Sequence, residues 1–227
     1  FFSGLSCDQQ PPMPAATVPA IQRLLPGTKS EDLYDWEDEE WGPRYLSSAL
    51  GVQEYLQAQI RRDPSNFDRL FTSPPGLETR WQYEHMRLII LELNHFVVKL
   101  SSVCTHLTCP KMKATDEWLF LCACHKTPQE CSAMDYSLHT MDGAATVLNS
   151  QRYFAQRDHI PQEKETFQLF SNMLRRLYRI FAHAYYHHRE TFNAFESKRF
   201  LCERFVRFGL VNKLINKKHL IMPVGMG

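Results

Sequence analysis

Four residues that are chemically suited to binding a metal ion stand as two pairs with the same spacing. Cys104 and Cys109 have four residues between them, and His183 and His188 repeat this gap further along the chain. Two thiolates and two imidazoles make a complete tetrahedral ligand set for Zn²⁺. The 73 residues between the pairs exceed any zinc-finger spacing, so only the fold could bring them together. On spacing alone, buried free cysteines and surface histidines explain the pattern equally well.

The helix expected around the two histidines complicates this assignment. On a regular helix residues 183 and 188 lie about 140° apart, whereas residues 183 and 187 lie about 40° apart. His187 therefore competes with His188 as a ligand. A helical wheel places His188 in line with the apolar Leu174 and Phe181, and His183 off that stripe. Both could bind one ion only if the helix bends or the ion lies at its flank.

A second group of possible metal ligands occurs in a short segment: Cys122, Cys124, His125 and Cys131. Residues 122 and 124 would share one face of a strand. Free cysteine is commonly buried simply as a small hydrophobic residue, and we therefore favour small side chains packed in a hairpin over a metal site.

Three arginines, Arg175, Arg176 and Arg179, lie on the same expected helix as the histidines. Their wheel angles of about 140°, 240° and 180° from Phe170 lie opposite the apolar stripe, which predicts a guanidinium cluster in solvent. Planar guanidinium groups suit phosphate, which accepts paired hydrogen bonds. A solvated helix face is the alternative. A third possibility is that the acidic run from Glu31 to Glu40 folds over the arginines and neutralises them.

The elements that must position these residues are predicted to be helices. Apolar residues recur at three- and four-residue spacing in five segments, 46–61, 77–103, 135–149, 167–190 and 197–209. The second segment is apolar on two sides and should be central, with one stripe of Ile89, Leu93, Phe96, Leu100 and Val103 and an opposite one of Leu88, Leu91 and Val98. Only 117–125 has the composition of a strand. The sequence predicts an all-α domain over 25–227 after a flexible, proline-containing arm over 1–24.

Composition narrows the class of protein. The 227 residues carry 26 Lys and Arg against 25 Asp and Glu, so bulk charge gives no reason to expect a nucleic-acid partner. The longest apolar runs, such as 118–124, are far shorter than the ~20 residues needed to cross a bilayer. Seven unevenly spaced cysteines favour reduced thiols, and the first residues lack signal-peptide features. We expect a cytoplasmic protein.

Several short motifs occur in a fixed order along the chain. They are Pro26-Gly27-Thr28-Lys29 with Tyr34-Asp35-Trp36, Tyr83-Glu84-His85, Leu91-Glu92-Leu93-Asn94, Cys104 to Cys109, His125-Lys126-Thr127-Pro128, Asp142-Gly143-Ala144, and Arg175 through His188. In these motifs the chain resembles the MOB family of kinase-regulating adaptors, and most closely its phocein branch. The resemblance covers about residues 25–223.

The resemblance implies a MOB fold, built on a four-helix bundle with a short β-hairpin and one structural zinc ion. It implies Cys104, Cys109, His183 and His188 as the zinc ligands and so chooses His188 over His187. In related members, the basic cluster that corresponds to Arg175, Arg176 and Arg179 binds phosphorylated segments of kinases. Four protein ligands close the coordination sphere, which predicts a structural ion.

By the same resemblance, we expect a non-catalytic adaptor in a striatin-organised (STRIPAK-type) complex. The implied partners are a striatin-type scaffold, phosphatase type 2A subunits and Ste20-like kinases, in the cytoplasm, with peripheral attachment to Golgi or endocytic membranes left open. The alternative is a direct coactivator of an AGC-class (NDR/LATS-like) kinase. A zinc enzyme is disfavoured because the chain has neither a His-Glu-x-x-His motif nor the deaminase pairing of His-x-Glu with Pro-Cys-x-x-Cys.

Overall fold

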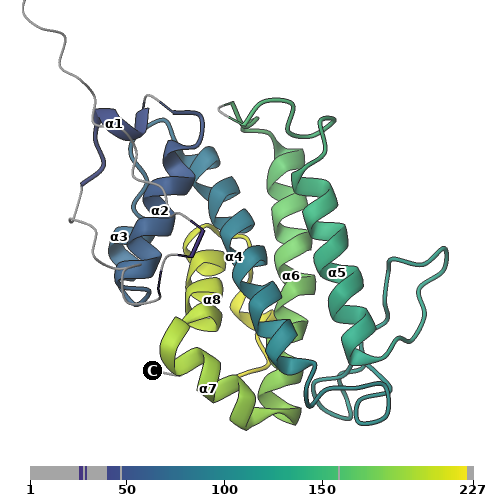
Figure 1. The fold of residues 1–227 in the computed structure, drawn as a ribbon. Coiled ribbons are helices and arrows are strands. Elements are labelled where there is room, and N and C mark those ends of the chain that lie inside the picture. Colours follow the sequence, from purple (N-terminus) through teal and green to yellow (C-terminus); the bar gives the residue numbers. More distant parts are fainter. Residues whose placement is uncertain (1–25, 28, 30–39, 47, 158, 224–227) are drawn as a thin grey trace, which may run out of the picture.

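The computed structural model shows long helices packed side by side (Figure 1) and describes residues 26–27, 29, 40–46, 48–157 and 159–223. The predicted arm over 1–24 and all but the last residue of the acidic run lie outside the described residues. The domain boundary predicted after residue 24 therefore stays a prediction, as does the folding of the acidic run over the arginines.

Within the described residues the regular structure is helical, as predicted. In chain order the elements are α1 (Pro43–Leu46), α2 (Gly51–Arg62), α3 (Phe67–Phe71), α4 (Glu78–Leu100), α5 (Ala133–Leu148), α6 (Lys164–His187), α7 (Arg189–Arg199), α8 (Leu201–Val211) and the 3₁₀ turn η2 (Lys217–His219). The segments predicted from the sequence leave out α3, and α1 except for its last residue, because four or five residues are too few to show a helical period.

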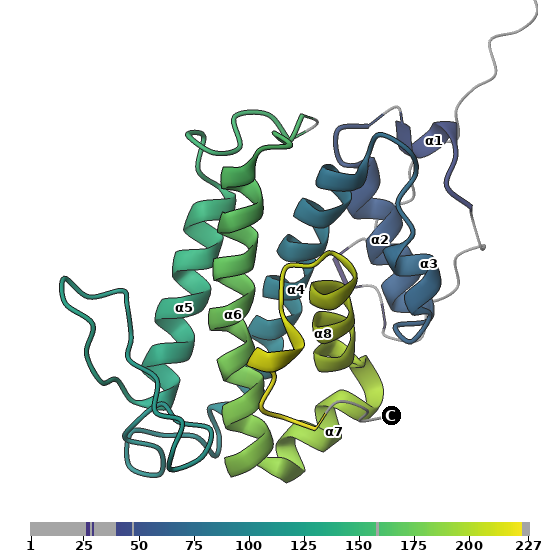
Figure 2. The same cartoon turned by 180° about the vertical axis from the view of Figure 1, so that it is seen from behind.

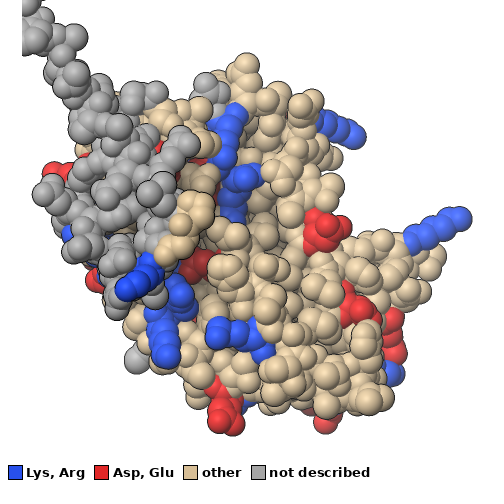
Figure 3. All heavy atoms as spheres, viewed as in Figure 1, with Lys and Arg blue, Asp and Glu red and all other residues tan. Residues whose placement is uncertain are grey.

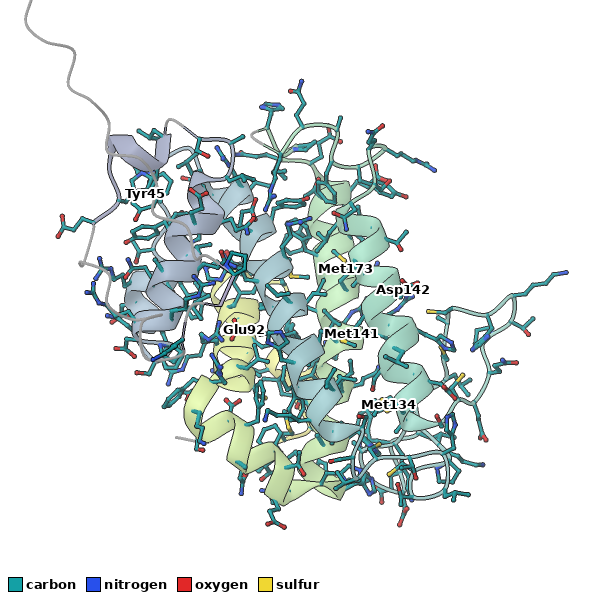
Figure 4. The ribbon with its side chains drawn as sticks, in the orientation of Figure 1. Tyr45, Glu92, Met134, Met141, Asp142 and Met173 are labelled. Carbon is teal, nitrogen blue, oxygen red and sulfur yellow. The ribbon has the colours of Figure 1, made fainter. Side chains whose placement is uncertain are left out.

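Four helices form the body of the protein. Contacts join α4 to α5, α5 to α6, α6 to α8 and α8 back to α4, and consecutive members run in opposite directions (Figures 1 and 2). Phe181 of α6 packs 6.0 Å from the ring of Phe96 on α4 and 5.0 Å from that of Phe205 on α8. Met141 of α5 is buried, whereas the next residue, Asp142, points outward (Figure 4). The all-α class is confirmed.

Helix α4 is central, but only part of its second apolar stripe is covered. Leu88 is buried with Val52 and Leu56 of α2, in a second, smaller hydrophobic cluster. Leu91 and Val98 remain 48% and 63% exposed, so the expectation that they are buried is wrong. The reason is that α2 flanks only the first part of α4 (Figure 1).

Three successive buried residues of α4 bind three different parts of the chain. Tyr83 donates a hydrogen bond to the last carbonyl of α5 at 2.7 Å. The carboxylate of Glu84, which is fully buried, accepts two bonds of 2.7 Å from Arg157. Nε2 of His85 lies 2.8 Å from the carbonyl oxygen of Leu70 in α3, and burial lowers the His85 pKa to about 4. A neutral imidazole with a proton on Nε2 therefore donates this bond.

A second charged pair links α4 to α8. Nη2 of Arg204 lies 2.6 Å from the carboxylate of Glu92, and Arg204 is only 2% exposed (Figure 4 labels Glu92). The pair fixes how far α8 is shifted along α4, because a displacement by one turn would leave a buried guanidinium without its carboxylate.

The helix predicted over 197–209 corresponds to α8 and the last residues of α7, and most of α7 lies in the gap between the segments predicted over 167–190 and 197–209. Phe200 has a φ of 49°, in the left-handed region, and interrupts the helix between α7 and α8. The carboxylate of Glu196 then accepts bonds of 2.8 Å from the backbone N–H groups of Cys202 and Glu203. A side chain of α7 thus satisfies donors that the start of α8 would otherwise leave free.

The predicted β-hairpin is not confirmed. In the described part of the chain, the pairing around 117–125 consists of two isolated bridges, Lys113 with Leu119 and Cys122 with Gln129. Residues 101–132 instead form a long loop that runs beside the first turns of α5 (Figure 1).

The described surface shows no large field of one charge on the face drawn in Figure 3. Lysine and arginine side chains are scattered there, with a broad uncharged area between them. Among the described helices, none is both long enough and apolar enough to cross a membrane.

The Glu84–Arg157 pair leads to a prediction about stability. Arg157→Ala leaves a carboxylate in the core without its partner, and we expect it to lower the free energy of unfolding by about 3 kcal/mol. Urea unfolding followed by circular dichroism measures this loss. The exposed Arg152→Ala in the same loop is the control and should cost less than about 0.5 kcal/mol. Equal effects of the two changes would show that the pair contributes little.

Candidate metal centre

The turn that follows α4 positions the first two thiols. The backbone N–H of Cys104 donates to the carbonyl of Leu100 at 2.8 Å, and that of Cys109 donates to Thr105 at 2.9 Å. Between them, the hydroxyls of Thr105 and Thr108 accept bonds from each other's backbone N–H groups at 3.2 and 2.8 Å. This loop keeps both sulfur atoms on the side that faces α6.

The two histidines lie where α6 ends. The helix stops at His187, and His188 has non-helical angles of φ −136° and ψ 50°. This break frees His188 from the 140° offset of a regular helix, so its side chain reaches Cys109. His183 is 1% exposed although the wheel placed it off the apolar stripe, because the loop after α4 covers that flank of α6.

The four side chains form one cluster, and their distances fit a metal ion. The four ligand atoms all lie within 4.8 Å of one another. Nε2 of His183 is 3.5 Å from the sulfur of Cys104, and Nε2 of His188 is 3.2 Å from that of Cys109. Tetrahedral Zn–S and Zn–N bonds would place sulfur and nitrogen about 3.5 Å apart. Nδ1 of His183 lies 2.7 Å from the carbonyl oxygen of Lys113, the outer contact usual for a metal-bound histidine.

The electrostatics of this cluster leave its four side chains uncharged when no cation is bound. Burial and the neighbouring Cys109 raise the pKa of the Cys104 thiol to about 12, and burial lowers the pKa of His183 to about 4. Burial also lowers the pKa of His188. The imidazoles are thus neutral and able to donate a lone pair, while the thiols need a positive charge nearby before they can ionise. The ring of His187 lies tilted against that of His183, with ring centroids 4.8 Å apart, and His187 does not belong to the cluster.

The three arginines do not share one environment. Arg175 and Arg176 are exposed, as predicted. Arg179 is half-buried: its Nη1 donates to the hydroxyl of Tyr136 at 2.7 Å, and its guanidinium lies 4.8 Å from the ring centre of Phe120. The prediction that all three project into solvent is therefore wrong for Arg179, because α5 and the preceding loop cover that side of α6.

The second predicted ligand group is rearranged. The structure brings Cys122, His125 and Cys131 together with His139 of α5, which the sequence analysis did not include. Cys124 is exposed, and its sulfur contacts the backbone carbonyl of His139 at 3.3 Å. Histidine at this point gave no spacing signal, because the gap from Cys131 to His139 spans the end of a loop and almost two helical turns.

These features define a class before any comparison is made: an antiparallel helical bundle with a two-cysteine, two-histidine cluster at one end and exposed arginines on α6. The chain belongs to the Mob1/phocein family, whose sequence model matches residues 58–223.

Two relatives match nearly the whole chain. The protein named MOB kinase activator-like 4 from Drosophila melanogaster is 46% identical over 208 residues, which cover 91% of this chain and 92% of the relative. The MOB-like protein phocein of Caenorhabditis elegans is 41% identical and covers 90% of both chains. MOB kinase activator-like 3 of Drosophila melanogaster is less similar, at 30% identity over 63% of this chain.

The contacts of Arg179 predict that it stabilises the fold. Arg179→Met removes its hydrogen bond to Tyr136 and its contact with Phe120, and we expect a loss of about 2 kcal/mol in the free energy of unfolding. Arg176→Ala, in the next turn toward the start of α6 and exposed, should change it by less than about 0.5 kcal/mol. Urea titrations of the two variants test this, and a larger loss in Arg176→Ala would contradict it.

Proposed function

We propose that this protein is a non-catalytic, zinc-stabilised adaptor subunit of a striatin-organised, STRIPAK-type complex. Its partners would be a striatin-type scaffold, phosphatase type 2A subunits and Ste20-like kinases. The observation that carries the proposal is the 41% identity to a protein named phocein over 90% of both chains. The family match over residues 58–223 spans helices α4 to α8 and the positions of all four cluster residues.

Zn²⁺ is the metal we assign to Cys104, Cys109, His183 and His188. Thiolate and imidazole donors select zinc over magnesium and calcium, which prefer oxygen ligands. Four protein ligands leave no coordination position for water, which supports a structural role and an adaptor without catalytic activity. The ion would hold the end of α4 against the end of α6.

The zinc assignment predicts the effect of removing one ligand. Cys104→Ser should lower the zinc content by one ion per chain and greatly reduce the melting temperature. A structural zinc ion contributes about 10 kcal/mol or more, which is comparable with the whole stability of a domain. Elemental analysis and thermal circular dichroism measure the two effects.

The control is Cys202→Ser, because Cys202 is buried but lies outside both clusters. It should keep the full zinc content with a modest loss of stability. Unchanged zinc content in Cys104→Ser would exclude the assigned site.

A second candidate function is direct activation of an AGC-class kinase through phosphopeptide binding. The exposure of Arg175 and Arg176 on α6 favours it, since guanidinium groups bind phosphate through paired, charge-assisted hydrogen bonds. The relative from Drosophila melanogaster also carries the name of a kinase activator.

Purification of partners distinguishes the two functions. With the tagged chain as bait, striatin-type and phosphatase type 2A subunits should copurify if it is an adaptor of the proposed complex. An AGC-class kinase in their absence would support the alternative and contradict the first proposal.

The double variant Arg175→Ala/Arg176→Ala tests the exposed arginines of α6 in a separate experiment. Calorimetry with a phosphopeptide should show at least about tenfold weaker binding at an unchanged melting temperature, as expected when charged hydrogen bonds of about 1.5–3 kcal/mol each are lost. Unchanged binding would exclude Arg175 and Arg176 as phosphate ligands.

We place this adaptor in the cytoplasm, where reduced cysteines persist, and leave peripheral attachment to Golgi or endocytic membranes as part of the proposal. Residues 25–227 would act as one domain.

A further inference from the structure

We propose that Cys122, His125, Cys131 and His139 bind a second structural Zn²⁺, which clamps the loop between α4 and α5 onto α5. The four ligand atoms lie within 4.8 Å of one another, the same limit that the first cluster meets. The proposal concerns a separate site and does not depend on which partners the protein has.

Three parts of the chain meet at this second cluster. Cys122 and Gln129 pair through both backbone groups, at 2.8 and 3.2 Å, and this bridge closes the short loop that carries His125. Cys131 directly precedes Ser132, whose hydroxyl caps the start of α5. His139 lies further along α5, so that its ring faces the loop.

The distances in the second cluster suit a shared ion. Nδ1 of His139 is 3.6 Å from the sulfur of Cys122 and 4.0 Å from that of Cys131. Nε2 of His125 is 2.9 Å from the sulfur of Cys131. These values surround the separation of about 3.5 Å between sulfur and nitrogen ligands of tetrahedral zinc. A thiol–imidazole hydrogen bond joins only two side chains. Here two sulfur and two nitrogen atoms from three segments face one another, as the ligands of a single ion do.

Residues 123–130 of the loop bury too little apolar surface to hold the segment in one position. From 123 to 130 every residue except His125 is exposed, so burial of apolar side chains holds little of this segment. Its backbone pairing within the described residues is the single bridge between Cys122 and Gln129. The proposed ion would be bound by Cys122 and His125 of the loop, by Cys131 and by His139 of α5. It would hold the segment in one fixed position, as structural metal ions do in small domains with little core.

The donor set also selects the ion and its role. Two thiolates and two neutral imidazoles favour zinc over oxygen-seeking cations, and four protein ligands leave no open position for a substrate. Cys124, two residues from Cys122, is exposed outside the group and remains available as a control.

The clamp would also shape the surface beside the arginines. Phe120, two residues before Cys122, lies under the guanidinium of Arg179. The loop therefore borders the arginines of α6 on one side. An ion that fixes the loop would also fix that side of the arginine surface.

Native mass spectrometry and elemental analysis of the unmodified full chain test the proposal. We expect two zinc ions per chain in the wild type. Cys131→Ser and His139→Ala should each lose the same ion, that of the second cluster, and should retain the helical circular dichroism signal. Cys124→Ser is the matched control and should retain both. With a chelator, zinc release from the wild type should show two phases, and the faster phase, from the more exposed second cluster, should be absent in Cys131→Ser.

The outcomes separate the two sites. One zinc in the wild type that is lost in Cys131→Ser but kept in Cys104→Ser would support the second site and contradict the first. A zinc content that neither Cys131→Ser nor His139→Ala changes overturns the second site. A disulfide between Cys122 and Cys131 in the purified wild type also overturns it, because a disulfide removes two of the ligands.

Discussion

Helix α4 contacts α2, α5, α7 and α8, so each polar group that it turns inward must find its partner on another element. Glu84 shows the constraint most strongly, because its carboxylate is fully buried and depends on Arg157 from the loop before α6. Its neighbour His85 depends on α3, and Glu92 depends on α8. Hydrophobic burial alone would allow these elements to slide along α4, whereas buried directional bonds allow one position.

At the opposite end of the bundle, other interactions than buried ion pairs between helices hold the chain. Where α4 ends, residues 101–132 form a long loop in which regular backbone pairing is sparse among the described residues. Thiols and imidazoles gather there in two clusters, and the carbonyl of Lys113 in the same loop contacts His183 of the first cluster. Helix packing thus positions one end of the protein, whereas clusters of thiols and imidazoles lie at the other. If both clusters bind zinc, as proposed, loss of an ion would act first on this loop and on the end of α6.

Part of this arrangement can be predicted from sequence because it follows from local periodicity. The recurrence of Leu93, Phe96 and Leu100 defines the buried side of α4, and the structure buries all three. What the sequence does not determine locally is where a helix stops. The end of α6 at His187 decides that His188 can reach Cys109, and the left-handed Phe200 decides that α7 and α8 are separate. Both depend on neighbouring elements.

The same reasoning explains why the place of His139 in the second cluster and the contacts of Arg179 cannot be predicted from the sequence. A helical wheel describes one helix in water, so it assigned Arg179 to solvent without knowing that Phe120 and Tyr136 cover that side. His139 likewise gains a partner only through the path of the loop before α5. In both cases residues 101–132 supply the missing contact.

This loop also separates a half-buried arginine from exposed arginines on α6. Arg179, on the covered side, is committed to contacts within the fold, and its replacement would disturb the packing of α5. Arg175 and Arg176, one turn earlier, are exposed, so the fold does not depend on their burial. A surface of that kind can change its charge with little effect on stability, whereas the residues beneath it cannot. If Arg175 and Arg176 bind a partner, as proposed, changes at these two positions would alter that binding and leave the packing of the bundle intact.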